Sequence, residues 1–217
     1  MLDFSILIEH KKEFLAGFLT TLEVSLLALV LSLILGTVLA VMKISPLKPL
    51  KGLATVYIEF IQNTPLLIQI FFFYFGLPAV GIQLNPFISG TLGLAVYSSA
   101  YIAEAIRAGI QAVSHGQVEA GRASGLTYMQ TMLHIILPQA IKVVIPPLGN
   151  QFLNLVMGSA ILGSISGKDL MYYGDIISSD TFVVFDVYIF VALFYLILTV
   201  PLSLFINYLE RKLSASD

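Results

Sequence analysis

The sequence predicts an all-α membrane protein that forms one domain, residues 1–217, and crosses the bilayer five times. Of the 217 residues, 58% are hydrophobic and only 11% are charged, about half the charged fraction of a typical soluble domain. Those charges fall between long apolar runs. With no cysteine, the chain has no disulfides or thiolate metal sites. The net charge of −2 provides no basic surface for nucleic acid.

Charge-free runs give the positions of the spans. A helix needs about 20 apolar residues to cross a bilayer, and the run between Phe60 and Ala103 is long enough for two such helices. Gly76-Leu77-Pro78 and Asn85-Pro86 interrupt this run and predict a tight connection there. The expected spans are residues 17–42, 53–78, 86–108, 135–162 and 183–208.

The distribution of Lys and Arg predicts the orientation. Cytoplasmic loops are enriched in these residues, and five spans place eight of them on one side and three on the other. The larger group is Lys43, Lys48, Lys51, Arg107, Arg122, Lys142, Arg211 and Lys212, and the smaller is Lys11, Lys12 and Lys168. We therefore expect the amino terminus outside, the carboxyl terminus in the cytoplasm, and residues 109–134 in a cytoplasmic connection.

That connection contains signals for two short helices. Ser114 with Gln117, and Thr127 with Gln130, have capping-box spacing, and Gly125 lies between them as a helix stop. Glu119 is expected in the first turn of the first helix, where a carboxylate favours the helix dipole. An apolar strip of Val118, Leu126, Met129 and Leu133 accompanies these helices. The strip either rests on the ends of the spans or binds a partner.

Several segments together identify a family. They are residues 101–110 (YIAEAIRAGI), 116–126 (GQVEAGRASGL), 136–140 (ILPQA) and 146–152 (PPLGNQF), preceded by 57–60 (YIEF), 64–69 (TPLLIQ) and 74–78 (YFGLP). From about Thr20 to its end, the chain closely resembles the permease subunits of ATP-binding-cassette importers for polar amino acids, of the histidine, glutamine, arginine and opine type. The resemblance implies the type I permease fold of these importers.

The resemblance also implies partners and a coupling site. The segment 116–126 resembles the family's EAA loop, whose short helix docks on the ATPase subunit; the residues that correspond to it are Gly116, Glu119, Ala120, Ala123, Gly125 and Leu126. By the same resemblance we expect a second permease copy or homologue, an extracytoplasmic solute-binding protein, and a location in the bacterial cytoplasmic membrane. ATP and Mg would bind to the partner ATPase, and this chain would bind no cofactor.

Three positions depart from the family pattern. Gly121 stands where the motif usually has a second alanine, Gln62-Asn63 precedes Thr64-Pro65 where an arginine is common, and the segment 156–160 (VMGSA) replaces a Lys followed by Asp or Asn and Thr-Ser. The first is a small-for-small change and should preserve docking. The other two leave the substrate class and details of gating open.

Polar residues near the middle of three spans indicate a substrate path, because a polar group within hydrocarbon needs a partner. They are Asn63 and Thr64 in the second span, Tyr97 and Ser98 in the third, and Asn150, Gln151 and Asn154 in the fourth. These uncharged groups could bind a polar or basic amino acid. The alternative is hydrogen bonding between helices, which holds a bundle together without a transport role.

Charged residues give two further alternatives. Glu59 and Glu104 lie at matching depth toward the cytoplasm, with Arg107 and Lys142 nearby; they form either buried ion pairs or an inner vestibule on the substrate path. Outside, an acidic rim is expected, either a docking face for the binding protein or a merely solvated connection. Its residues are Lys168, Asp169, Asp175, Asp180 and Asp186.

The motifs of an enzyme are missing from the sequence. The run from Gly163 to Lys168 is one residue too short for a phosphate loop, and the sequence has no metal-binding or nucleophile motif. The chain is therefore expected not to be catalytic. An ion-coupled secondary transporter or a channel subunit is the alternative, although the first would favour internal repeats and the second would not need capped cytoplasmic helices.

Overall fold

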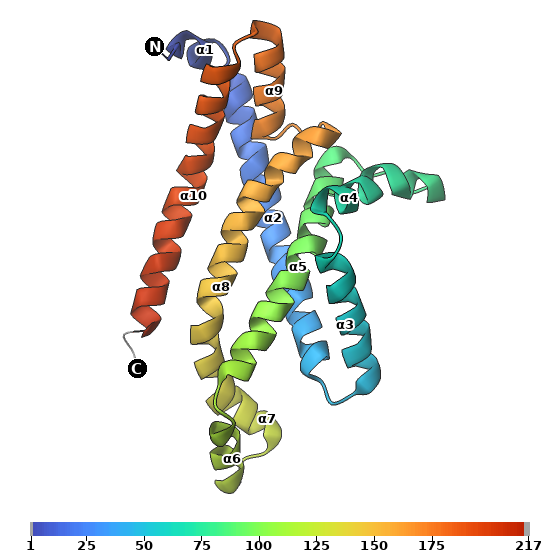
Figure 1. Ribbon diagram of the computed structural model, residues 1–217, viewed down its shortest axis with the longest axis vertical. Helices are drawn as coiled ribbons and strands as arrows, with labels where there is room; N and C mark the ends of the chain where they lie inside the picture. The colour runs from blue at the N-terminus through green and yellow to red at the C-terminus, as the bar shows by residue number, and fades with distance from the viewer. Residues whose placement is uncertain (1, 215–217) are drawn as a thin grey trace.

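The computed structural model describes residues 2–214, which form a bundle of long helices with short helices at both ends (Figure 1). The α-helices are α1 (Phe4–Glu9), α2 (Lys11–Ile44), α3 (Lys48–Gln62), α4 (Leu66–Phe71), α5 (Pro86–Ala112), α6 (His115–Ala123), α7 (Tyr128–Thr131), α8 (Leu137–Gly158), α9 (Leu170–Thr181) and α10 (Val184–Ser214). The π-helical turns η1 (Phe72–Gly76) and η3 (Met132–Ile136) and the 3₁₀ segments η2 (Leu77–Val80) and η4 (Ser159–Ile165) extend them.

Several helices are long and apolar enough to cross a membrane. Lys11–Ile44, Tyr128–Ile165 and Val184–Leu213 qualify individually, and Lys48–Gln62 with Leu66–Val80 makes a fourth if the bent pair is one span. These segments contain the expected first and fourth spans and all of the fifth except its first residue. The fourth begins earlier than expected, because α7, η3, α8 and η4 follow one another without a loop.

Helix α5 lies at the centre of the bundle. It has 27 residues, about 40 Å of helix, and it packs against α2, α3, α4 and α8. Many of its buried residues are small or hydroxylated, among them Ser89, Gly90, Gly93, Ser98 and Ser99. Because neighbouring helices surround it, α5 needs less apolar surface than a helix that faces lipid.

Small residues let α2 approach its neighbours closely. Buried small residues recur along one face of α2 at intervals of three or four, in the order Gly17, Thr21, Ser25, Ala28, Ser32, Gly36 and Ala40. A Cβ atom added to Gly36 would lie 2.7 Å from Ile102 Cγ2 and 2.9 Å from the Ser99 carbonyl oxygen of α5. This small-residue face is the usual means by which membrane helices pack, since hydrophobicity alone does not join helices in lipid.

The second expected span, residues 53–78, is not one helix. Helices α3 and α4 meet at an angle of 105°, and the chain between them runs through Asn63, Thr64 and Pro65. Pro65 has no N–H to donate and disfavours a helical conformation at Thr64. The segment is a single span only if this bent pair crosses as one, and α4 with η1 and η2 projects sideways from the bundle (Figure 1).

The connection between α5 and α8, which the sequence predicts to be cytoplasmic, has the two expected short helices, with one cap as predicted. Thr127 and Gln130 form the complete capping box of α7, and Gly125 adopts a left-handed conformation with φ 82° after α6. The prediction of a capping box formed by Ser114 and Gln117 was wrong, because the Ser114 side chain makes no cap hydrogen bond. Glu119 was also misplaced: α6 begins at His115, so Glu119 lies beyond its first turn.

We expect Gly36→Leu to lower the free energy of unfolding by about 1–3 kcal/mol, because the larger side chain would overpack the contact between α2 and α5. The matched control is Gly52→Leu in α3, where an added Cβ has nothing within 4 Å. Thermal unfolding of the purified chains in detergent measures both. Equal midpoint temperatures for the two variants would contradict the close approach of α2 and α5.

Candidate substrate path and coupling site

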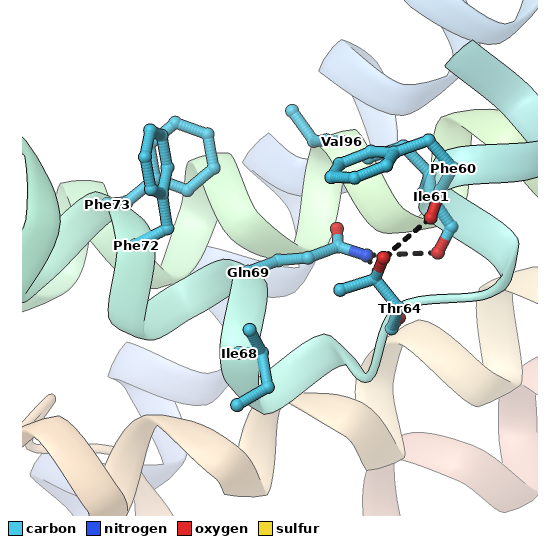
Figure 2. Close-up of a pocket in the computed structure, with 8 residues that line it drawn as sticks. All are labelled: Phe60, Ile61, Thr64, Ile68, Gln69, Phe72, Phe73 and Val96. Carbon is cyan, nitrogen blue, oxygen red and sulfur yellow. Dashed lines mark hydrogen bonds between the residues drawn. The ribbon is translucent and has the colours of Figure 1, made fainter. Parts of the chain in front are cut away.

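Side chains at the bend between α3 and α4 donate to backbone carbonyls in the last turn of α3 and at the break, two of which, Glu59 and Ile61, also accept backbone N–H groups. Asn63 Nδ2 donates to the Glu59 carbonyl at 2.7 Å, and Thr64 Oγ1 donates to the Phe60 carbonyl at 2.6 Å. Gln69 Nε2 reaches back from α4 and donates to the carbonyls of Ile61 and Thr64, both at 3.1 Å (Figure 2). The bend is therefore a fixed feature held by hydrogen bonds.

These hydrogen bonds give Asn63 and Thr64 a structural role, which is to hold the bend, in addition to their predicted place on the substrate path. Asn63 remains exposed and Thr64 half-buried, so a path role for them stays a prediction. The sequence did not point to Gln69 as a residue that holds the bend. The available signal was an amide shortly after a proline within an otherwise apolar segment.

Helix α8 presents two amides on an exposed face. Val143, Pro147, Asn150, Asn154 and Met157 are all exposed, and their spacing places them on one side of the helix. Pro147 has no N–H, so the Val143 carbonyl lacks its usual helical donor. Amides facing hydrocarbon are unfavourable, so this face must meet water or another protein surface. Gln151 beside it is half-buried.

The predicted path residues of α5 are less accessible. Ser98 is buried, and Tyr97 is half-buried with its hydroxyl 3.2 Å from that of Tyr101. The neighbouring Ser99 hydroxyl lies 3.0 Å from the Tyr57 hydroxyl of α3, a contact between helices. A path role for Tyr97 and Ser98 stays a prediction.

Glu104 is the centre of an ion-pair cluster. It pairs with Lys43 of α2 and, at 2.7 Å, with Arg107 one turn further along α5. All three side chains are largely covered, and the pair with Lys43 joins α2 to α5 near one end of the bundle. Glu59, by contrast, is exposed on α3. The two carboxylates therefore lie in different environments, and their place on a substrate path remains a prediction.

The predicted coupling residues lie on and just after α6, at the opposite end of the molecule from α1 and α9 (Figure 1). Gly116, Glu119, Ala120, Ala123 and Gly125 are exposed, and Leu126 is half-buried. Glu119 contacts His115 at 3.1 Å, and both side chains are mostly exposed. Of the apolar strip, Met129 and Leu133 are 61% and 52% exposed, whereas Val118 and Leu126 are half-buried, so part of the strip is free to contact a partner.

Gly121, the departure from the family motif, has a packing reason. It is buried, and a Cβ atom there would lie 2.8 Å from Thr131 Cγ2 and 2.9 Å from Ile135 Cδ1. Glycine thus lets α6 pack closely against the helical segment that leads into α8.

At the other end, Asp169 does not belong to the exposed acidic rim. It is completely buried, and its carboxylate accepts hydrogen bonds from the backbone N–H groups of Met171 and Tyr172 at the start of α9. Burial raises its pKa to about 6. Asp175 and Asp180 are exposed as expected. Among residues 2–214, no group of three or more His, Asp or Glu side chains is arranged to hold a metal ion.

The described chain is all-helical and has several apolar spans. One span exposes amides, and an exposed helical loop lies at one end. This is the organisation of a membrane permease. Residues 28–215 match the family described as "Binding-protein-dependent transport system inner membrane component". The chain therefore belongs to this family of importer permeases, and the resemblance seen in the sequence is confirmed.

Individual relatives cover nearly the whole chain. It is 60% identical, over 99% of its length and 100% of the relative's, to the "Probable glutamine ABC transporter permease protein GlnM" of Bacillus subtilis. The GlnP protein of the same organism, with a similar description, is 35% identical over 94% of this chain and 95% of its own. The solved "amino acid ABC transporter with histidines" has a TM-score of 0.92 at 41% identity, covering 98% of this chain and 99% of its own. The MetNI methionine transporter, at 19% identity and a TM-score of 0.72, shares the fold.

The buried Asp169 predicts a pH-dependent stability. Its pKa is raised on folding from the ordinary value of 3.8 to about 6. The contribution of the protonated carboxyl to the free energy of unfolding is therefore fully present below about pH 4 and is lost as the pH rises through 6. Asp169→Asn keeps an acceptor for α9 but cannot ionise. We expect this variant to be more stable than the wild type at pH 7.5, by about 1–3 kcal/mol.

Thermal unfolding midpoints at pH 5 and pH 7.5 measure this difference, with Asp180→Asn at an exposed position of α9 as the control. A wild-type pH dependence in the Asp169→Asn variant would show that another group is responsible.

Proposed function

We propose that this chain is the membrane-spanning subunit of an ATP-driven importer that carries a polar amino acid, with glutamine as the first candidate. The observation that carries the proposal is the exposed Asn150–Asn154 face of α8, a surface suited to uncharged hydrogen bonding with an amino acid. The relatives' descriptions as glutamine transporter permeases support the choice of substrate. The segment 156–160 leaves a different polar or basic amino acid as an alternative.

In the proposed topology, residues 1–217 form one transmembrane domain with five spans in the bacterial cytoplasmic membrane. Helix α5 is the additional span, and α3 with α4 and its extension is the second. The amino terminus would be outside and the carboxyl terminus cytoplasmic. The Lys and Arg residues support this orientation, because α6 and the end of α10 carry Arg122, Arg211 and Lys212 while Lys168 lies beside α9.

The proposed transporter contains two permeases, either two copies of this chain or this chain with a homologue. Two ATPase subunits would bind ATP and Mg and supply the energy, so this chain itself would not be catalytic. An extracytoplasmic solute-binding protein would deliver the substrate at the end that carries α1 and α9.

The connection from α6 to α8 offers a physical route for coupling. Helix α6 packs through Gly121 against Thr131 and Ile135, and the helical segment that contains these two residues continues into α8. A displacement of α6 by the ATPase would therefore move the helix that bears Asn150. In the proposed cycle, this movement exposes the path alternately to the two sides of the membrane.

We expect Glu119→Lys to reduce ATP-dependent uptake at least tenfold, because it reverses the charge on the surface proposed to contact the ATPase. The permease should still fold, since Glu119 is exposed and its described side-chain contact is to the neighbouring His115. The measurement is uptake of labelled glutamine and other amino acids by proteoliposomes that contain this chain, the ATPase and the binding protein.

Glu210→Lys, at an exposed position near the end of α10, is the control for charge reversal and should retain uptake. Unchanged uptake by Glu119→Lys would remove the coupling role of α6. Uptake driven by an ion gradient without ATP would overturn the importer proposal as a whole.

We expect Asn150→Leu to raise the KM for the transported amino acid about tenfold, because one good hydrogen bond contributes on the order of 1 kcal/mol and more when its partner is left unpaired. Uptake across a range of substrate concentrations measures KM in the same proteoliposomes. Val143→Leu on the same exposed face is the control, and a wild-type KM for Asn150→Leu would remove the substrate role of that residue.

A further inference from the structure

A pocket of about 290 Å³ lies at the bend between α3 and α4 (Figure 2). Three aromatic rings, Phe60, Phe72 and Phe73, and the aliphatic side chains of Ile61, Ile68 and Val96 form most of its wall. Phe60, Ile68 and Phe72 are each more than half exposed, so the rim is open on one side. The walls come from α3, α4, η1 and α5.

One polar atom in this apolar wall lacks a partner. Gln69 is 6% exposed, and among the residues that the structure describes no hydrogen-bond donor reaches its Oε1. The orientation of the amide is fixed, because both groups that face its other end are carbonyls and require the donor Nε2. Figure 2 shows the oxygen directed toward the space between Phe73 and Phe60.

A buried acceptor without a partner is unfavourable and normally has a reason. Here the backbone carbonyls at the bend are occupied by Asn63, Thr64 and the amide nitrogen of Gln69. The amide oxygen is therefore the group left over once the bend has been formed. The Thr64 hydroxyl also lines the pocket but already donates to the Phe60 carbonyl, so the pocket offers one unpartnered acceptor beside the rings.

We propose that this pocket binds planar bicyclic apolar molecules that carry one N–H donor, of which indole is the simplest. An apolar cavity of about 150 Å³ holds benzene, so a pocket of about 290 Å³ has room for a fused two-ring molecule. Indole N–H donates and does not accept, which matches a lone acceptor. Its faces and edges suit a wall of phenylalanine rings.

The same features exclude the other small occupants of a membrane transporter. A polar amino acid brings an ammonium and a carboxylate, and no charged side chain of the described residues lines the pocket, so both groups would lose their hydration without compensation. A lipid acyl chain has no N–H or O–H and would leave the Gln69 oxygen unpartnered. The proposal concerns binding and does not depend on the substrate or coupling proposed above.

The experiment uses the full-length permease in nanodiscs of phosphatidylethanolamine and phosphatidylglycerol, titrated with 5-fluoroindole and followed by fluorine NMR. We expect a saturable change in chemical shift that excess indole reverses. Ile68→Trp should weaken this binding at least tenfold, because the new ring fills the pocket from its rim. Ile34→Trp, at an exposed position of α2, is the matched control and should bind as the wild type does.

A second measurement on the wild type tests the amide oxygen without any variant. 1-Benzothiophene has nearly the shape of indole but no N–H, and we expect it to displace 5-fluoroindole at least tenfold less effectively. Equal displacement would overturn the role of Gln69. Equal signals from the wild type and Ile68→Trp would mean that 5-fluoroindole only partitions into the bilayer, which would overturn the proposal. The absence of a saturable signal would overturn it too, for example because a second copy of the chain covers the rim.

Discussion

The close packing around α5 is the constraint on which the rest of the structure depends. Glycines along α5 each make room for a side chain of a different neighbour: Gly90 for Leu162 of η4, Gly93 for Ile70 of α4, and Gly109 for Val144 of α8. On α2, Gly36 faces Ile102 of α5. Because lipid supplies no hydrophobic force between helices, the bundle depends on this close contact and on a few polar links such as Lys43–Glu104.

The bend between α3 and α4 follows from the same need to satisfy polar groups within an apolar environment. Pro65 breaks the helix, and a free carbonyl in hydrocarbon is unfavourable. Thr64 and Gln69 supply side-chain donors to carbonyls at the break, and Asn63 adds a second donor to the Glu59 carbonyl, which keeps its backbone hydrogen bond. The bend is thereby fixed, and the side chains that form it also enclose the pocket at the Gln69 amide.

The continuous helical segment of α7, η3 and α8 connects the proposed sites. At its start, α6 packs through Gly121 against Thr131 of α7 and Ile135 of η3; further along, α8 exposes Asn150 and Asn154. The tight contact favours movement of α6 and α8 as one unit, since packed helices resist independent displacement. This geometry gives the importer proposal a mechanical basis that is separate from the resemblance to known permeases.

The sequence by itself determined features that depend on local chemistry. The apolar segments, the capping box of Thr127 and Gln130, the turn at Gly125 and the family of the protein could all be read from neighbouring residues. Tertiary structure decided the 105° bend, the partner of Glu104 on α2, the burial of Asp169 and the role of Gln69. These features depend on contacts between distant segments, as with Lys43 and Glu104, which are separated by 61 positions. Hydrophobic length and local spacing do not specify which side chains meet when helices pack.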